Sequence, residues 1–200
     1  LMNRFDTASS AYNIPLAVRV TGDLNVPALQ QALRDLLERH ESLRTVFPEH
    51  DGEPVQVVLP AERVDLDLSP MTVTADVVDA HVLSVLARGF DVSASVPIRS
   101  RLLQVSEQEL IVVVVVHHIS ADGVSMAPLA RDVATAYLAR SRGESPRWAP
   151  LEVQYADFAL WQREVLGDER DPESLAANQF DYWTRTLAGI PEVLELPTDR

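Results

Sequence analysis

The stretch "LIVVVVVHHISADGVS", residues 110 to 125, begins with seven apolar residues and ends in a polar turn. A continuous apolar run of this length, bounded by turn residues, is typical of a strand that is buried on both faces. His117 and His118 follow the run directly. Neighbouring strand residues point to opposite faces, so we expect one histidine to face the packed core and the other a cavity.

Three interpretations of the histidine pair are open at this point. Both could be satisfied core histidines that cap the sheet, or one could act in a site. A shared metal ion is disfavoured because the two side chains diverge and no third ligand lies nearby at helical or strand spacing.

The rest of the chain predicts a mixed α/β fold of layered α+β character, in which helices pack on a mixed sheet. The first strand and helix span residues 11–22 and 25–40, with Asn25 as N-cap. The remaining expected elements are extended pieces at 42–47 and 53–59, a helix at 74–90 capped by Thr74 and stopped by Gly89, a hairpin at 98–118, and helices at 125–143, 153–167 and 173–189.

Composition excludes several classes of function. A formal net charge of -13 argues against nucleic-acid binding. The absence of cysteine excludes disulfides, thiolate catalysis and cysteine metal sites, and fits a cytoplasmic location. No apolar run approaches the ~18 residues of a membrane helix. The chain begins at Leu1 without a signal peptide or a start methionine, which suggests a fragment.

Asp122 and Gly123 follow the histidines in or just after a turn. A buried carboxylate needs a cationic partner or several N–H donors, and arginine suits that role. The alternative is that Asp122 or Ser125 is an ordinary N-cap of the following helix. Gly123 would allow a tight turn or a close backbone approach. Ser120 lacks the surroundings of a nucleophile elbow.

These residues carry a family resemblance. "HHISADG" matches the pattern HHxxxDG and resembles the signature of condensation domains of nonribosomal peptide synthetases, whose superfamily includes chloramphenicol acetyltransferase. Three more stretches resemble family segments in order and spacing: "RHESLRTVF" (39–47), "YADFALW" (155–161) and residues 182–200. The first family motif, of pattern SxAQxRLW, is missing before Leu1.

The resemblance implies the N-terminal lobe of a two-lobed condensation domain over residues 1–200. Residues 1–142 would form the acetyltransferase-like core, and residues 143–200 a helical segment and crossover linker towards a C-terminal lobe outside this chain. The complete domain would join a carrier-bound donor acyl or peptidyl thioester to the amine of a carrier-bound acceptor. The isolated lobe is expected to be inactive.

The resemblance also assigns roles to residues. His118 would be the general base or a group that positions the amine, and His117 would be structural. Asp122 would be a structural carboxylate paired with Arg44, in preference to Arg39, and Asp122→Ala should fold poorly. The N–H of Gly123 could hold a developing oxyanion. Tyr155 and Trp161 share one helical face and are expected to pack.

The implied partners are the upstream and downstream peptidyl carrier proteins, the C-terminal lobe and a neighbouring adenylation domain. Carrier proteins would deliver phosphopantetheine arms, and this lobe would bind no cofactor or metal itself. "AYNIPL" and "MAPLARD" resemble domains that accept a D-configured donor. Heterocyclisation is disfavoured because that subtype lacks the two histidines. The alternatives are an epimerisation domain, which "RHESLRTVF" disfavours, and a non-catalytic module that binds a carrier protein.

Overall fold

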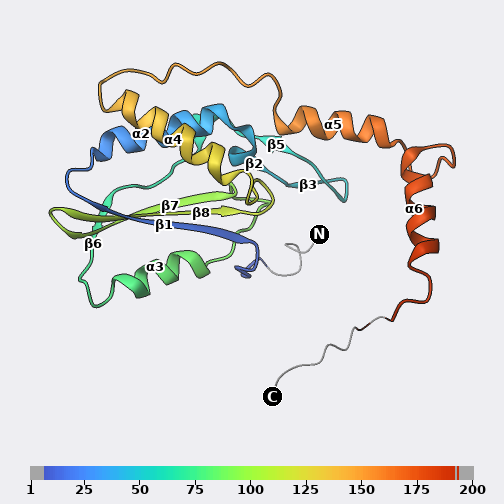
Figure 1. Cartoon of the computed structure of the whole chain (residues 1–200), viewed down its shortest axis with the longest axis horizontal. Helices are drawn as coiled ribbons and strands as arrows, with labels where there is room; N and C mark the ends of the chain where they lie inside the picture. Colours follow the sequence, from blue (N-terminus) through green and yellow to red (C-terminus); the bar gives the residue numbers. More distant parts are fainter. Residues whose placement is uncertain (1–6, 192, 194–200) are drawn as a thin grey trace. The chain divides into compact units, whose positions relative to one another are not determined.

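The computed structural model describes residues 7–191 and 193. The chain divides into two compact units, Leu1–Gln154 and Tyr155–Arg200. The paired histidines and the segments that surround them belong to the first unit (Figure 1).

The first unit is built on a four-stranded sheet with strand order β1-β8-β7-β6. Its strands are β1 (Asn13–Thr21), β6 (Pro70–Thr72), β7 (Ile98–Ser106) and β8 (Glu109–His117). β8 runs antiparallel to both neighbours, whereas β6 runs parallel to β7. The expected mixed sheet and the expected hairpin are therefore confirmed.

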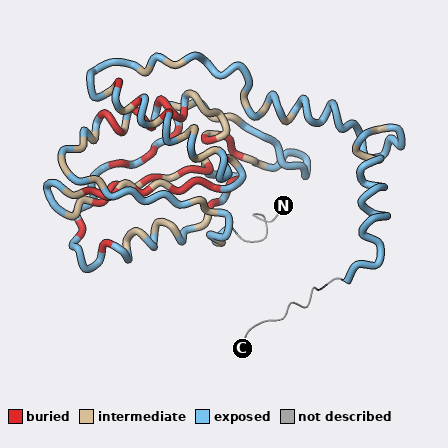
Figure 2. Tube along the Cα trace, viewed as in Figure 1, coloured by how far each residue is buried: buried red, intermediate tan, exposed pale blue. Residues whose placement is uncertain are grey.

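Helices cover both faces of this sheet (Figure 1). α2 (Val26–Arg39) and α4 (Met126–Arg140) lie on one face, and α3 (Val78–Ala87) lies on the other. The apolar run of β8 supplies both interfaces. Its even-numbered residues from Leu110 to Val116 belong to the cluster under α2 and α4, and Ile111, Val113 and Val115 belong to the cluster under α3. The strand is buried on both faces as the sequence predicted (Figure 2).

The helix ends follow the sequence in part. Asn25 caps α2 as expected, because its Oδ1 accepts a hydrogen bond of 3.0 Å from the Ala28 N–H. Thr74 does not cap α3, which begins at Val78 with no side-chain cap. The Thr74 carbonyl instead accepts from the Val77 N–H at 3.2 Å, so a separate turn precedes the helix.

Residues 41–63 form short elements in place of the two longer extended pieces. They are the 3-10 helices η1 (Glu41–Arg44) and η2 (Ala61–Arg63) and the strands β2 (Thr45–Val46), β3 (Glu49–His50), β4 (Glu53–Pro54) and β5 (Val57–Val58). β2 pairs with β5, and β3 pairs with β4 across the turn at Asp51 and Gly52. Both turn residues have positive φ, 51° and 85°, which favours glycine and tolerates aspartate.

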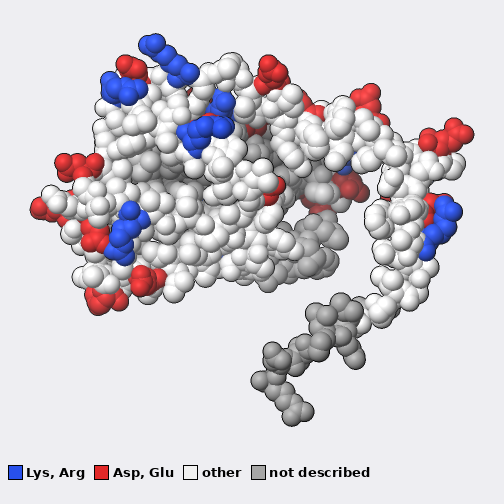
Figure 3. Space-filling view, in the orientation of Figure 1, with Lys and Arg blue, Asp and Glu red and all other residues white. Residues whose placement is uncertain are grey.

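β1 is an edge strand, and two of its apolar side chains are partly exposed. Leu16 and Val18 are 41% and 44% exposed. They line an apolar cavity of about 300 Å³ together with side chains of α2, α4 and β8. Figure 3 shows that the face over β1 carries few charged side chains, with both acidic and basic side chains around it.

The second unit contains α5 (Tyr155–Leu166) and α6 (Leu175–Thr186). Tyr155, Phe158 and Trp161 lie along one face of α5, with neighbouring ring centroids 5.9 and 5.7 Å apart. The shared face of Tyr155 and Trp161 is confirmed, and both rings pack against Phe158 between them, although neither is buried. They are 54% and 57% exposed.

Candidate functional site

His117 is buried at the end of β8, on the α3 side of the sheet. Its side chain and backbone together are only 5% exposed. Its ring lies 5.8 Å from the ring of Phe90 and 5.9 Å from that of Tyr12, centroid to centroid. Burial is the main cause that lowers the pKa of His117, and the nearby His118 and Arg99 lower it further. His117 is therefore a neutral imidazole packed in the protein interior.

Hydrogen bonds that His117 accepts shape the turn that follows. Its Nδ1 accepts a bond of 3.1 Å from the Ile119 N–H. Its carbonyl accepts from the N–H of Ser120 at 3.0 Å and from the Ser120 hydroxyl at 3.2 Å. These bonds close a tight turn that contains His118 and Ile119.

His118 is exposed, whereas His117 is buried, so the two histidines face opposite sides as the alternation of strand residues predicted, and the exposed one is the residue that the family motif indicated. Its N–H donates to the Tyr12 carbonyl at 2.8 Å, which ties its backbone to the segment that leads into β1. Its imidazole makes no hydrogen bond or ion pair with any residue between 7 and 191. The ring is therefore available to a ligand, on a backbone that is held from both sides.

Asp122 does not pair with an arginine, which corrects the expected brace. Its Oδ1 accepts from the N–H of Ser125 at 2.9 Å and from the Ser125 hydroxyl at 2.6 Å. The Ser125 hydroxyl accepts in turn from the Asp122 N–H at 3.1 Å. These bonds, those to the hydroxyl first, lower the pKa of Asp122. The carboxylate is exposed, so it does not need the cationic partner that a buried charge requires. Ser125 occupies the N-cap position of α4, but its side chain makes no capping hydrogen bond, and the bonds between Asp122 and Ser125 close the turn that precedes the helix.

Gly123 shows neither feature that would demand glycine. Its φ is not positive, and a Cβ placed on it would meet no atom within 4 Å. Gly123 lies in the expected turn, but this turn does not require glycine, and the expected close backbone approach is wrong. The role of its N–H towards an oxyanion stays a prediction.

Arg44 and Arg39, the two expected partners of Asp122, are both engaged elsewhere. The Arg44 guanidinium donates to the carbonyls of Leu37 at 2.8 Å and Leu59 at 2.6 Å. Arg39 Nε donates to Oδ2 of Asp132 on α4 at 2.9 Å. Both arginines thus hold the segment after α2 in place, and neither reaches the turn at Asp122.

Asp132 is the charged residue that the sequence analysis missed. It is 6% exposed, and its Oδ2 contacts both Arg39 Nε and His40 Nε2 at 2.9 Å. Burial would raise the pKa of Asp132, but the hydrogen bonds from His40 and Arg39 outweigh it and lower the pKa. Asp132 lies on the buried stripe of α4 with Ala136 and Ala139. An aspartate on the apolar face of a predicted helix indicates a buried charge that needs a cationic partner, and the neighbouring Arg39 and His40 were available for that role.

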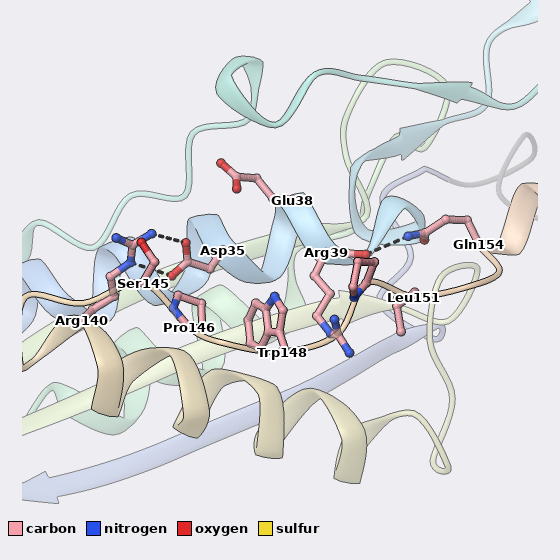
Figure 4. A pocket seen from close by; sticks show the side chains of 10 residues that line it. Asp35, Glu38, Arg39, Arg140, Ser145, Pro146, Trp148, Leu151 and Gln154 are labelled. Atoms are coloured by element: carbon pink, nitrogen blue, oxygen red, sulfur yellow. Dashed lines mark hydrogen bonds and ion pairs between the residues drawn. The ribbon is translucent and has the colours of Figure 1, made fainter.

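A polar hollow of about 470 Å³ lies beside this ion pair, between α2 and residues 145–154. Figure 4 shows the Arg140 guanidinium bridged to Asp35 on one side and Gln154 bonded to the Arg39 carbonyl on the other. Arg39 also donates to the Ala149 carbonyl at 2.7 Å and lies 4.8 Å from the Trp148 ring centroid. Residues 143–154 therefore belong to the first unit, whereas the sequence placed its end near 142.

Neither a metal centre nor a membrane helix can be assembled from the described residues. Among residues 7–191 and 193, no cluster of three or more histidine, aspartate or glutamate side chains could hold a metal ion. In the same part of the chain, no helix is both long and apolar enough to cross a bilayer.

Comparison with known proteins identifies the family. The condensation domain family model matches residues 1–200. The chain belongs to the condensation domain family. It is 47% identical over 199 residues to a probable non-canonical nonribosomal peptide synthetase, CymA, of Salinispora arenicola, and covers 2% of that protein. It is also 47% identical over 191 residues to a dimodular nonribosomal peptide synthase of Bacillus subtilis, covering 96% of this chain and 8% of the relative.

A solved structure gives the same result for the fold of this condensation-domain chain. The X-domain from teicoplanin biosynthesis, solved in complex with OxyB, superposes with a TM-score of 0.88 at 38% identity. The match covers 96% of this chain and 42% of that one. The expected chloramphenicol acetyltransferase-like fold is thus confirmed, and the chain spans less than half of its solved neighbour and a small part of its curated relatives.

Proposed function

We propose that this chain is the histidine-bearing lobe of a condensation domain that forms an amide bond between two carrier-bound substrates. The observation that carries the proposal is the state of His118. Its ring is exposed and without a hydrogen-bond partner in the described chain, yet its backbone is fixed by Tyr12 and by the turn bonded to His117. Because its backbone is fixed and its imidazole is unbonded, His118 can bind a substrate amine in a defined geometry.

The reaction follows from that placement. The acceptor amine attacks the carbonyl carbon of the donor thioester, a C–N bond forms, and the C–S bond breaks to release the donor carrier's thiol. The amine loses one proton and the leaving thiolate gains one. His118 either takes the amine proton as a general base or accepts a hydrogen bond that orients the amine. The N–H of Gly123, which has no acceptor among the described residues, is placed in the same turn region to receive the oxyanion.

The partners of this reaction are part of the proposal. Donor and acceptor carrier proteins deliver both substrates on phosphopantetheine arms, and a C-terminal lobe completes the channel. An adenylation domain of the same assembly line loads the acceptor. The relatives of this chain include nonribosomal peptide synthetases, which supports this setting. A D-configured donor residue is the subtype that the sequence favours.

The test is amide formation by the complete domain with both carrier proteins loaded, followed by mass spectrometry of the product thioester. His118→Ala should lower the rate by about 10²- to 10⁴-fold, the usual contribution of a positioned acid-base group. His50→Ala is the matched control, because its ring is 78% exposed in the β3–β4 turn, and it should leave the rate unchanged. A normal rate in folded His118→Ala would remove His118 from the mechanism.

A further variant separates the two roles of His118. Glutamine keeps a polar acceptor near the position of the ring nitrogen but cannot take a proton at neutral pH. If His118 only orients the amine, His118→Gln should recover part of the activity lost in His118→Ala. If His118 is the base, both variants should be equally slow.

A docking function is the second candidate, and the similarity to the X-domain solved with OxyB favours it. In that case the chain would hold a protein partner and the histidines would not react. The complete domain would then bind its carrier or other partner with equal affinity before and after His118→Ala, and no amide would form in either sample.

A further inference from the structure

At the paired histidines, three buried polar atoms have no hydrogen-bond partner among residues 7–191 and 193: Nε2 of His117, Oδ1 of Asn13 and Nε of Arg99. Asn13 on β1 lies directly opposite His117 on β8. Arg99 on β7 lies opposite Val115, two residues before His117. Residues two apart on a strand share a face, so all three side chains project from the same face at the same end of the sheet.

The other polar atoms of these side chains hold them in place. Asn13 Nδ2 donates to the carbonyls of Leu86 at 2.8 Å and Arg88 at 2.9 Å, which assigns its Oδ1 as the remaining acceptor. The Arg99 guanidinium donates to the carbonyls of Gly89 and Arg88 at the end of α3. None of the three atoms can therefore be satisfied by simple rotation of its side chain.

The Arg99 and His117 side chains also share an aromatic neighbour. The central guanidinium carbon of Arg99 lies 3.8 Å from the centroid of the Phe90 ring, and the edge of the same ring system meets His117 at 5.8 Å between centroids. The phenyl ring packs against both polar groups from one side, but it has no nitrogen or oxygen atom that could accept a hydrogen bond from them.

The proton inventory of the three atoms is fixed. His117 Nδ1 accepts from the Ile119 N–H, so the proton of the neutral ring is on Nε2, which is a donor. Arg99 Nε–H is also a donor, and Asn13 Oδ1 is an acceptor. A group that binds all three must therefore accept two hydrogen bonds and donate one.

We propose that one ordered water molecule binds between Asn13, Arg99 and His117 and holds His117 as the Nε2–H tautomer. Its oxygen accepts from His117 Nε2–H and Arg99 Nε–H, and one of its protons is donated to Asn13 Oδ1. Three hydrogen bonds are the usual number for a buried water. An anion would meet the Asn13 oxygen with no proton to give it, and a cation would be repelled by the Arg99 guanidinium.

The water makes His117 a positioning residue for His118. With its proton held on Nε2, His117 keeps Nδ1 free to accept from Ile119 and to close the turn that presents the His118 ring. This consequence for the reaction rests on the proposed function, whereas the bound water does not.

A high-resolution crystal structure of the complete domain tests the water directly. We expect one water within about 2.7–3.2 Å of His117 Nε2, Asn13 Oδ1 and Arg99 Nε. Ring-nitrogen NMR of the ¹⁵N-histidine-labelled domain should show His117 as the Nε2–H tautomer. A direct protein partner for His117 Nε2, an empty site, or the Nδ1–H tautomer would each overturn the proposal, whether or not the domain makes amide.

Two substitutions of His117 test the positioning role. His117→Asn keeps an amide oxygen near the place of Nδ1 and removes the Nε2 donor, and His117→Leu removes both. We expect His117→Leu to lose about 10²-fold in kcat with little change in KM, and His117→Asn to recover most of that loss. Equal kcat values for the two folded variants would refute the positioning role. If His117→Leu does not fold, a large loss in folded His117→Asn refutes it.

Discussion

The buried cluster in which Asp132 contacts both Arg39 and His40 gives the sharpest prediction about stability. The three charged or polar side chains are 14%, 17% and 9% exposed, and they join the end of α2 to the middle of α4. Removing one member of a buried ion pair costs about 3–5 kcal/mol, because the remaining charge loses its partner. Alanine has a helix propensity up to about 0.7 kcal/mol better than aspartate, which offsets a small part. We therefore expect Asp132→Ala to lower the free energy of unfolding by about 2–4 kcal/mol.

Urea unfolding followed by far-ultraviolet circular dichroism measures this change. The exposed pair of Asp181 with Arg185 on α6, whose side chains are 72% and 79% exposed, supplies the control. Asp181→Ala removes a carboxylate of the same kind, and solvent screening should leave the midpoint unchanged. If Asp132→Ala shifts the free energy by less than about 1 kcal/mol, the pair does not brace the helices as described.

The same carboxylate fixes a pH dependence. The folded pKa of Asp132 is lowered, so its contribution is fully present above the unfolded value of about 3.9 and is lost as pH falls through the folded pKa. The free energies of unfolding of wild type and Asp132→Asn should therefore converge as the pH falls below the folded pKa of Asp132. Parallel curves would contradict the lowered pKa.

Three further outcomes follow from the residues around the histidines. Asp122→Ala should fold with a small decrease in melting temperature, since its carboxylate is exposed. If this variant failed to fold, the structural role first expected for Asp122 would be correct after all. Because the folded pKa of His117 is lowered, the unfolded histidine protonates first as the pH falls. The free energy of unfolding should therefore be unaffected by His117 above about pH 6.5 and decline below it. His117→Asn should remove this decline in thermal melts. Gly89→Ala should destabilise the chain, since the new Cβ would lie 2.2 Å from the Thr7 carbonyl oxygen, whereas Gly123→Ala meets nothing within 4 Å and should melt normally; equal melting temperatures would contradict these packing environments.

Local chemistry was sufficient to predict most of the regular elements. The 3.6-residue spacing of apolar side chains and the cap at Asn25 located α2, and the apolar run at residues 110–116 located β8. The short pieces between residues 41 and 63 were predicted less well. Two-residue strands are held by their partners in the tertiary structure, so their own sequence carries little signal of where they begin.

The candidate site divides in the same way. Alternation along a strand is a property of the backbone, and it predicted that one histidine would be buried and the other would not. The family motif indicated that His118 was the one that faces outward. The identity of the motif aspartate's partner was wrong, because a sequence pattern does not tell whether a carboxylate is buried. Asp122 lies at the surface, and Arg39 finds its carboxylate at Asp132, 93 residues away along the chain.

The sequence by itself therefore determined the family, the layered fold and the residue that faces outward at the end of β8. Each depends on periodicity, composition or a contiguous motif. Only the tertiary structure decided which charges pair and which polar atoms are enclosed together. Asn13, Arg99 and His117 come from three strands and share one end of one face only when the sheet forms, because hydrogen bonds and ion pairs act over a few ångströms in space and are indifferent to separation along the chain.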